Sequence, residues 1–172
     1  AGFKRTLGWK NFSTAAQVIT TSRTYIVGSN ILIPAGALQI GTILRWTFDV
    51  TKSAAGVAAS TYDIAFGTAG TTADTARVSF TKPAGTAVAD NGQVSITAVV
   101  RGPVGASAVV AGHFELTHNL AATGHAVIPA VNVTTVSAAF DITTPTNIGL
   151  CLTGGASDSV TISSDTYTFD TG

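Results

Sequence analysis

The sequence predicts an all-β protein, a single antiparallel β-sandwich of the jelly-roll type with an extended N-terminal arm. Short segments alternate apolar and polar residues with a period of two, which is typical of strands that bury one face. Breaks rich in Gly, Pro and Asn separate these segments at about 8–12 residues, the spacing expected for a sandwich or jelly roll. No segment keeps a helical period for three turns, so no long helix is expected.

Three short strands are predicted at the start of the sandwich. Residues 17–21 and 24–27 form two of them, and the third is an edge run from Ile31 to Ile33. It ends at Pro34, because proline cannot donate to a strand ladder.

Further strands follow, and apolar and polar residues alternate along them. They are predicted around residues 43–51, 60–67, 77–81, 93–101, 113–117, 136–142, 148–152 and 160–169. In the last of these, Val160 and Ile162 share one parity, whereas Tyr167 and Phe169 have the other. The change of parity predicts a bulge or bend near Ser163 to Thr166.

The apolar parity of each strand predicts one core between two sheets. Residues of the same parity within a strand point to the same face of the sheet. The predicted core residues are Leu44, Trp46, Phe48, Tyr62, Ile64, Phe66, Phe80, Ile96, Phe114, Phe140, Leu150 and Ile162.

The length of 172 residues fits one domain, divided here into an arm, residues 1–13, and a sandwich, residues 14–172. Charged residues make up 10% of the chain, against about 25% in an average protein. A surface so poor in charge predicts self-association, as a homotrimer or another oligomer. Apolar runs are far shorter than the about 18 residues that span a bilayer, so no membrane partner is expected.

The first quarter of the chain is basic, because its five cations all precede the first acid, Asp49. This is either a chance fluctuation or an arm that docks on an acidic partner, and the sequence leaves both open. Such an arm is expected to order only on docking, unless it pairs with its own sandwich as an extra edge strand. The candidate partner-binding residues are Phe3, Lys4, Arg5, Trp9, Lys10 and Phe12.

Residues that could carry catalysis or hold a metal are scarce. Cys151 lies between two leucines and is predicted to be a buried structural thiol. His113 and Glu115 share one strand face, but no third ligand is evident, so two solvent-facing polar residues are favoured over a metal site. His118 has the opposite parity. No enzyme activity, cofactor, metal or nucleic-acid partner is therefore expected.

Three segments carry a resemblance to a known group of proteins. They are Ile33-Pro34-Ala35-Gly36-Ala37-Leu38-Gln39-Ile40-Gly41-Thr42-Ile43-Leu44-Arg45, Val99-Val100-Arg101-Gly102-Pro103-Val104-Gly105-Ala106-Ser107 and Gly154-Gly155-Ala156-Ser157-Asp158-Ser159-Val160-Thr161-Ile162. Together they resemble tailed-bacteriophage virion structural proteins with jelly-roll-like domains, over residues 31–169. The resemblance implies a capsid decoration (cement) or head-fibre role, commonly as trimers, and transfers no functional residues. Asp158 stands where members of this group often have Asn.

The leading functional prediction is a non-enzymatic phage virion structural protein on the capsid surface. It would bind the major capsid protein and stabilise the assembled head. The alternatives are a host- or glycan-binding module of a fibre or tail tip, and a tail or baseplate component, since one fold hosts many roles. Most aromatic residues have core parity, which favours the structural role over a glycan-binding face.

Overall fold

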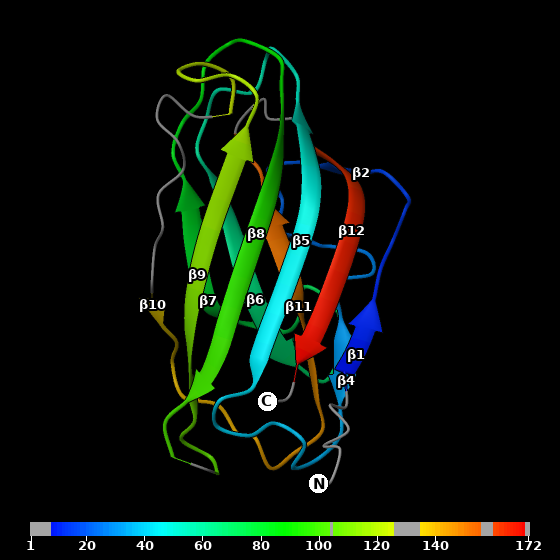
Figure 1. Cartoon of the computed structure of the whole chain (residues 1–172), viewed down its shortest axis with the longest axis vertical. Coiled ribbons are helices and arrows are strands. Elements are labelled where there is room, and N and C mark those ends of the chain that lie inside the picture. Colours follow the sequence, from blue (N-terminus) through cyan, green and yellow to red (C-terminus); the bar gives the residue numbers. More distant parts are fainter. Residues whose placement is uncertain (1–7, 104, 126–134, 156–159, 171–172) are drawn as a thin grey trace, which may run out of the picture.

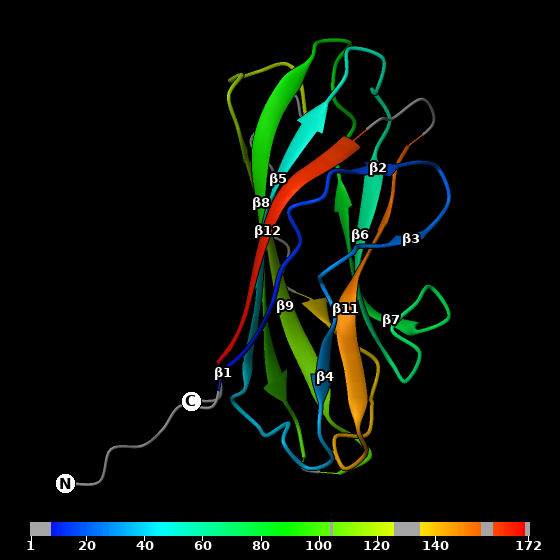
Figure 2. The same ribbon diagram turned by 90° about the vertical axis from the view of Figure 1, so that its right-hand side faces the viewer.

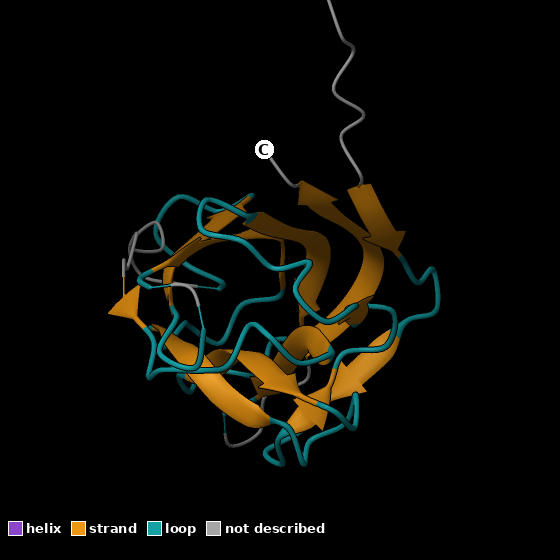
Figure 3. Cartoon of the chain, turned by 90° about the horizontal axis from the view of Figure 1, so that it is seen from below, coloured by secondary structure: helices purple, strands orange, loops and turns teal. Residues whose placement is uncertain are grey.

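The computed structural model describes residues 8–103, 105–125, 135–155 and 160–170, and for 8–10, 135–136 and 160–170 it describes the backbone alone. These residues form two antiparallel sheets packed face to face (Figure 1), and no helix occurs among them. The prediction of an all-β sandwich is confirmed. Figure 3, which looks along the long axis, shows the two layers of strands curving around the interior.

The larger sheet, called sheet A here, has seven strands in the order β1-β12-β5-β8-β9-β10, with β2 also paired to β12. Its strands are β1 (Gly8–Asn11), β2 (Gln17–Ile19), β5 (Ile43–Lys52), β8 (Asp90–Arg101), β9 (Val109–His118), β10 (Thr135–Val136) and β12 (Val160–Asp170). Sheet B has five strands in the order β3-β11-β6-β7, with β4 also paired to β11. Its strands are β3 (Thr24–Tyr25), β4 (Ile31–Ile33), β6 (Ser60–Gly67), β7 (Thr75–Lys82) and β11 (Thr146–Thr153).

The core lies between the inner faces of the two sheets. Every predicted core residue whose side chain is described is buried, and the side chain of Ile162 lies outside the described residues. Aromatic contacts join the layers: the ring centroids of Tyr62 on β6 and Phe114 on β9 are 4.9 Å apart. Such tilted pairs add to the stability that burial of apolar area provides.

The last strand contains the irregularity that its parity predicts. β12 pairs with β5 along its whole length, but the register shifts between Ile162 and Ser164. One extra residue at this point turns the following residues to the opposite face. The predicted bulge is therefore confirmed.

The segment from β1 to β4 closes one edge of the sandwich (Figure 2). β1 and β2 pair with β12 in sheet A, whereas β3 and β4 pair with β11 in sheet B. The expectation of an arm that orders only on docking is wrong for residues 8–11, which form an edge strand, the alternative left open above. The Trp9 backbone is paired with Phe169. Residues 1–7 lie outside the described part of the chain.

Candidate functional site: an apolar edge and a polar groove

Four large apolar side chains are exposed along the edge that β1 to β4 close, and we call them the N-terminal edge patch. They are Phe12, Val18, Val27 and Leu32, which are 69%, 61%, 59% and 62% exposed. Leu32 faces outward because its neighbours in β4 point into the core. Exposed apolar side chains along one edge offer area that a partner protein can cover.

Side-chain hydrogen bonds hold this edge together. Asn11 Nδ2 donates to the carbonyl oxygen of Asn30 over 2.7 Å. The Gln17 side chain donates to the Tyr25 carbonyl and accepts from the Val27 backbone N–H, each over 3.0 Å. The patch is therefore presented by an ordered backbone, although its strands are short.

Gly28 lets two parts of this edge approach closely. A Cβ built on Gly28 would lie 2.7 Å from the backbone carbon of Phe12, and the residue has a positive φ of 81°. Only glycine combines that conformation with so little space. The approach fixes the start of the Phe12 side chain against the turn after β3.

Of the six predicted partner-binding residues, Phe12 is placed in the N-terminal edge patch. Trp9 and Lys10 lie in β1, where the backbone alone is described. Phe3, Lys4 and Arg5 lie outside the described residues. The role of these six residues as an anchor stays a prediction.

A polar groove of about 490 Å³ lies on sheet A over β5, β8 and β9. Its outward-facing lining residues are Asp49, Thr51, Asn91, Gln93, Thr117 and Asn119. Val50, Gly92 and His118 also line it, but the Val50 and His118 side chains are buried. The groove is thus lined mainly by amides, hydroxyls and one carboxylate.

The strand register arranges these groups in two rows across the sheet. One row runs Asp49, Gln93, Thr117, because these residues are paired directly between neighbouring strands. Thr51 is likewise paired with Asn91, whose carbonyl accepts a 3.0 Å hydrogen bond from the Asn119 backbone N–H. Gln93 Nε2 donates to Asp49 Oδ1 over 3.1 Å. The rows are therefore fixed by the sheet itself.

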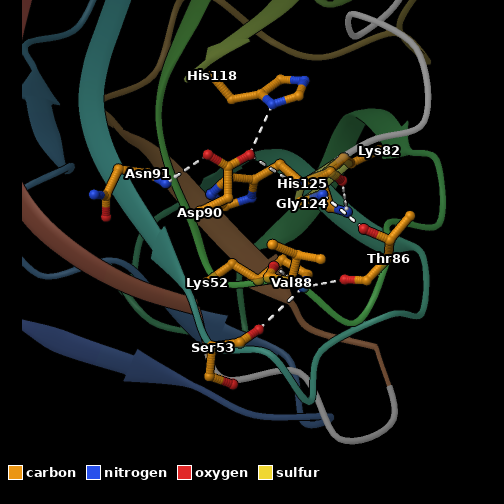
Figure 4. A network of polar contacts seen from close by, with 10 residues as sticks. All are labelled: Lys52, Ser53, Lys82, Thr86, Val88, Asp90, Asn91, His118, Gly124 and His125. Carbon is orange, nitrogen blue, oxygen red and sulfur yellow. Dashed lines mark hydrogen bonds and ion pairs between the residues drawn. The ribbon is translucent and has the colours of Figure 1, made fainter. Parts of the chain in front are cut away.

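Directly inside this end of sheet A lies a buried polar cluster (Figure 4), formed by Lys52, Lys82, Asp90, His118 and His125. His118 Nδ1 lies 2.7 Å from Asp90 Oδ2, which also accepts a 3.1 Å bond from the His125 backbone N–H. Lys52 Nζ donates to three carbonyls, at distances of 3.0, 2.6 and 3.0 Å. Lys82 Nζ donates to the His125 carbonyl over 2.7 Å. The cluster ties the loops after β5, β7 and β9 together.

The His125 side chain is fully buried, and neither ring nitrogen makes a hydrogen bond of ordinary geometry. Burial lowers the pKa of His125 to about 4; nearby Asp90 and the Val50 backbone oppose this, while Lys82 and His118 add to it. Burial alone would raise the pKa of Asp90, but hydrogen bonds from His125 and His118 hold it below its ordinary value. The cluster is thus arranged around a neutral His125 and an ionised Asp90.

We expect the free energy of unfolding to fall as the pH drops from 6.5 towards 4. The unfolded His125 takes up a proton near pH 6.5, whereas the folded one does so only near its pKa of about 4. In this window the unfolded state binds more protons, so acid costs about 3 kcal/mol in total. The stability contributed by Asp90 is lost at lower pH still, below its ordinary pKa, because its folded pKa is depressed.

Urea titrations between pH 7 and pH 4.5 test this expectation. His125→Phe should flatten the pH dependence of the free energy of unfolding. His113→Gln, on the outer face of β9 in sheet A, should keep this dependence. An unchanged slope in His125→Phe would contradict the assignment.

The remaining residues singled out by sequence lie apart. Cys151 is buried as predicted, and burial raises the pKa of its thiol to about 11. His113 is partly exposed and Glu115 exposed on the outer face of β9, and within the described ranges no group of three or more potential ligands could hold a metal. In the same part of the chain, no helix has the length and apolar character of a membrane span.

No protein-family model matches the chain, and no curated protein matches it. Among solved structures, the chain is similar to one described as the CBM2 module of Lactobacillus casei BL23 phage J-1 evolved Dit. The TM-score is 0.35 at 10% identity, and the match covers 82% of this chain and 68% of that one. Similarity at this level carries no argument about function.

Proposed function

We propose that this chain is a non-enzymatic structural protein of a bacteriophage virion that acts by adhesion. Its first role would be that of a binding module on a fibre or tail, in preference to capsid decoration. The observation that carries this preference is that the molecule has two separate and chemically different surfaces. The N-terminal edge patch is apolar and lies on β1 to β4, whereas the groove is polar and lies on β5, β8 and β9. The resemblance of the sequence to phage virion proteins supports the proposal that the protein is part of a virion.

The role proposed for each surface follows from its chemistry. Exposed aromatic and aliphatic side chains form stable contacts when another protein covers them, so the patch suits attachment to the virion. A groove of hydrogen-bonding groups on rigid strands suits a polar ligand, and a protein that serves only to cement a shell does not need one. A binding module uses both surfaces.

Support for a role without catalysis comes from the described residues. His118 and His125 are buried in the polar cluster, where His118 is paired with Asp90. The Cys151 thiol is buried, and its raised pKa keeps it protonated at neutral pH. Two histidines and the cysteine are thus directed to the interior, whereas His113 is partly exposed on the outer face of β9.

Capsid decoration is the second candidate, and the N-terminal edge patch favours it. In that role the patch would dock on the major capsid protein at the head surface. Self-association as a homotrimer through the charge-poor surface remains compatible with either role.

Location and copy number on the native virion separate the two roles. With antibodies against this chain, we expect immunogold particles on the tail or fibres, and quantitative mass spectrometry should give far fewer copies than the major capsid protein. Labelling over the whole head, with a copy number that follows the capsid subunits, would contradict the first role and support the second.

We expect Phe12→Ser combined with Leu32→Ser to reduce incorporation into virions by about 30-fold. Truncating an apolar interface residue outside the strongest hot spots costs about 1 kcal/mol, so the two substitutions together cost about 2 kcal/mol, and 1.4 kcal/mol corresponds to a factor of ten. The measurement is the amount of variant protein in particles assembled without the wild-type chain.

Val57→Ser combined with Val88→Ser is the matched control, because both side chains are exposed but lie in loops and are not among the four residues of the patch. This variant should be incorporated normally. Equal incorporation of both double variants would show that the N-terminal edge patch is not the attachment surface.

A further inference from the structure

We infer that the polar groove is a binding site for neutral, polyhydroxylated glycans, an inference that rests on the proposed role as a binding module. The contacts would come from Asp49, Asn91, Gln93, Thr117 and Asn119, with Thr51 at the end of the second row.

The lining selects a ligand that both donates and accepts hydrogen bonds. The three amides and two hydroxyls each offer donors and acceptors, and the Asp49 carboxylate accepts. A sugar hydroxyl likewise does both, so one hydroxyl can accept from an amide nitrogen and donate to a carboxylate oxygen. The Gln93 amide and the Asp49 carboxylate already lie within hydrogen-bond distance of each other, at 3.1 Å. They can therefore contact a single hydroxyl together.

The charge of the lining excludes other classes of ligand. Among the described residues that line the groove, none is a lysine or arginine, and His118 is buried against Asp90. A phosphate, a nucleic-acid backbone or a sulfated glycan would contact no lysine or arginine among these residues and would face the Asp49 carboxylate. One carboxylate is also too few for a calcium site, which takes six to eight oxygen ligands. An uncharged polar ligand fits this lining.

The spacing of the groups suits a chain of sugar units. Neighbouring strands are about 4.8 Å apart, and residues two apart on one strand are about 6.7 Å apart. The two rows therefore form a grid of polar groups across β5, β8 and β9, on which several hydroxyls of an oligosaccharide can be bound at once. Because no aromatic residue lines the described groove, recognition would depend on hydroxyl groups instead of ring stacking.

The groove is rigid because its strands are held from within. The Asp90 carboxylate accepts from the Asn91 backbone N–H over 2.9 Å and pairs with His118 at the end of β9. At Gly92 a Cβ would lie 2.7 Å from the Thr117 carbonyl oxygen, so β8 and β9 approach closely there. A preorganised grid loses little conformational entropy on binding.

The test is affinity electrophoresis of the full chain in gels that contain dextran, galactomannan or glycogen, with heparin as the charged probe. We expect at least one neutral polysaccharide to retard the protein and heparin not to do so. Asn91→Ala combined with Gln93→Ala should weaken the retardation by about tenfold or more, since two side chains that hydrogen-bond the ligand are removed. Both residues are exposed, so the melting temperature should not change.

Thr97→Val is the matched control, because Thr97 lies on the same face of β8 outside the groove. It should bind as the wild type does. Amide chemical shifts on titration with the retarding polysaccharide should change at residues 49–51, 91–93 and 117–119.

The inference is overturned if no neutral polysaccharide retards the wild type, if heparin is preferred, or if the double variant binds unchanged. Incorporation of the double variant into virions keeps the two proposals apart. If the wild type is incorporated into virions but binds no neutral polysaccharide, the virion role stands and the glycan site is refuted.

Discussion

Trp46→Ala should lower the free energy of unfolding by about 3–5 kcal/mol, the cost of truncating a fully buried aromatic side chain. Trp46 is completely buried at the centre of β5. Its indole Nε1–H donates to the Ser29 carbonyl over 3.1 Å, so the substitution also leaves a buried acceptor without a partner. Equilibrium unfolding in guanidinium chloride measures the loss.

Trp46→Phe separates the two causes. It keeps most of the buried area and removes the hydrogen bond, so its cost should be markedly smaller than that of Trp46→Ala. If Trp46→Ala unfolds at the wild-type denaturant concentration, the core assignment is wrong.

Asp90→Ala should cost a similar amount, about 3–5 kcal/mol, although the residue carries no apolar area. Its carboxylate accepts hydrogen bonds from two backbone N–H groups and pairs with His118, and the same cluster holds two buried lysines. Removing this carboxylate leaves the buried His125 backbone N–H and the buried His118 side chain without the group that they contact. Thermal unfolding at neutral pH measures the effect.

Asp141→Ala is the control for this substitution. Asp141 accepts hydrogen bonds from the backbone and side chain of Thr143 in an exposed turn. Its loss should cost much less than the loss of Asp90, because these hydrogen bonds are exposed to solvent. Equal effects of the two substitutions would mean that the buried cluster does not stabilise the sandwich.

Much of the fold could be predicted from local patterns, because a strand with one buried face alternates apolar and polar residues along its sequence. Alternation in 43–51 placed Leu44, Trp46 and Phe48 in the core, where they lie. The change of parity in the last strand predicted its bulge, since a register shift must exchange the two faces.

The pairing of β1 with β12 could not be predicted in this way. The two strands lie near opposite ends of the sequence, and no local pattern specifies a contact between residues so far apart in the chain. The segment 8–11 is also too short to show alternation clearly.

The buried cluster had a signal that the sequence analysis did not use. The strands β5, β7 and β9 each end on a polar residue that has the parity of the strand's core residues: Lys52, Lys82 and His118. Likewise, β8 begins with Asp90 on the parity of its core residues. In antiparallel neighbours such ends meet at one end of the sandwich. The groove was missed for a different reason: its outward residues resemble any solvated face until the register brings them into rows.

The position of β11 and β12 in the two sheets has a consequence for synthesis on the ribosome. β12 lies between β1 and β5, and β11 lies between β3 and β6, so both sheets depend on strands from the C-terminal part of the chain. Until those residues leave the ribosome, β5 and β6 each present an unpaired edge. The nascent chain therefore stays open to aggregation for most of its synthesis, and folding is slow because long-range pairing must come last. Chaperone binding during translation would protect β5, which carries part of the groove, and β6, which carries part of the core.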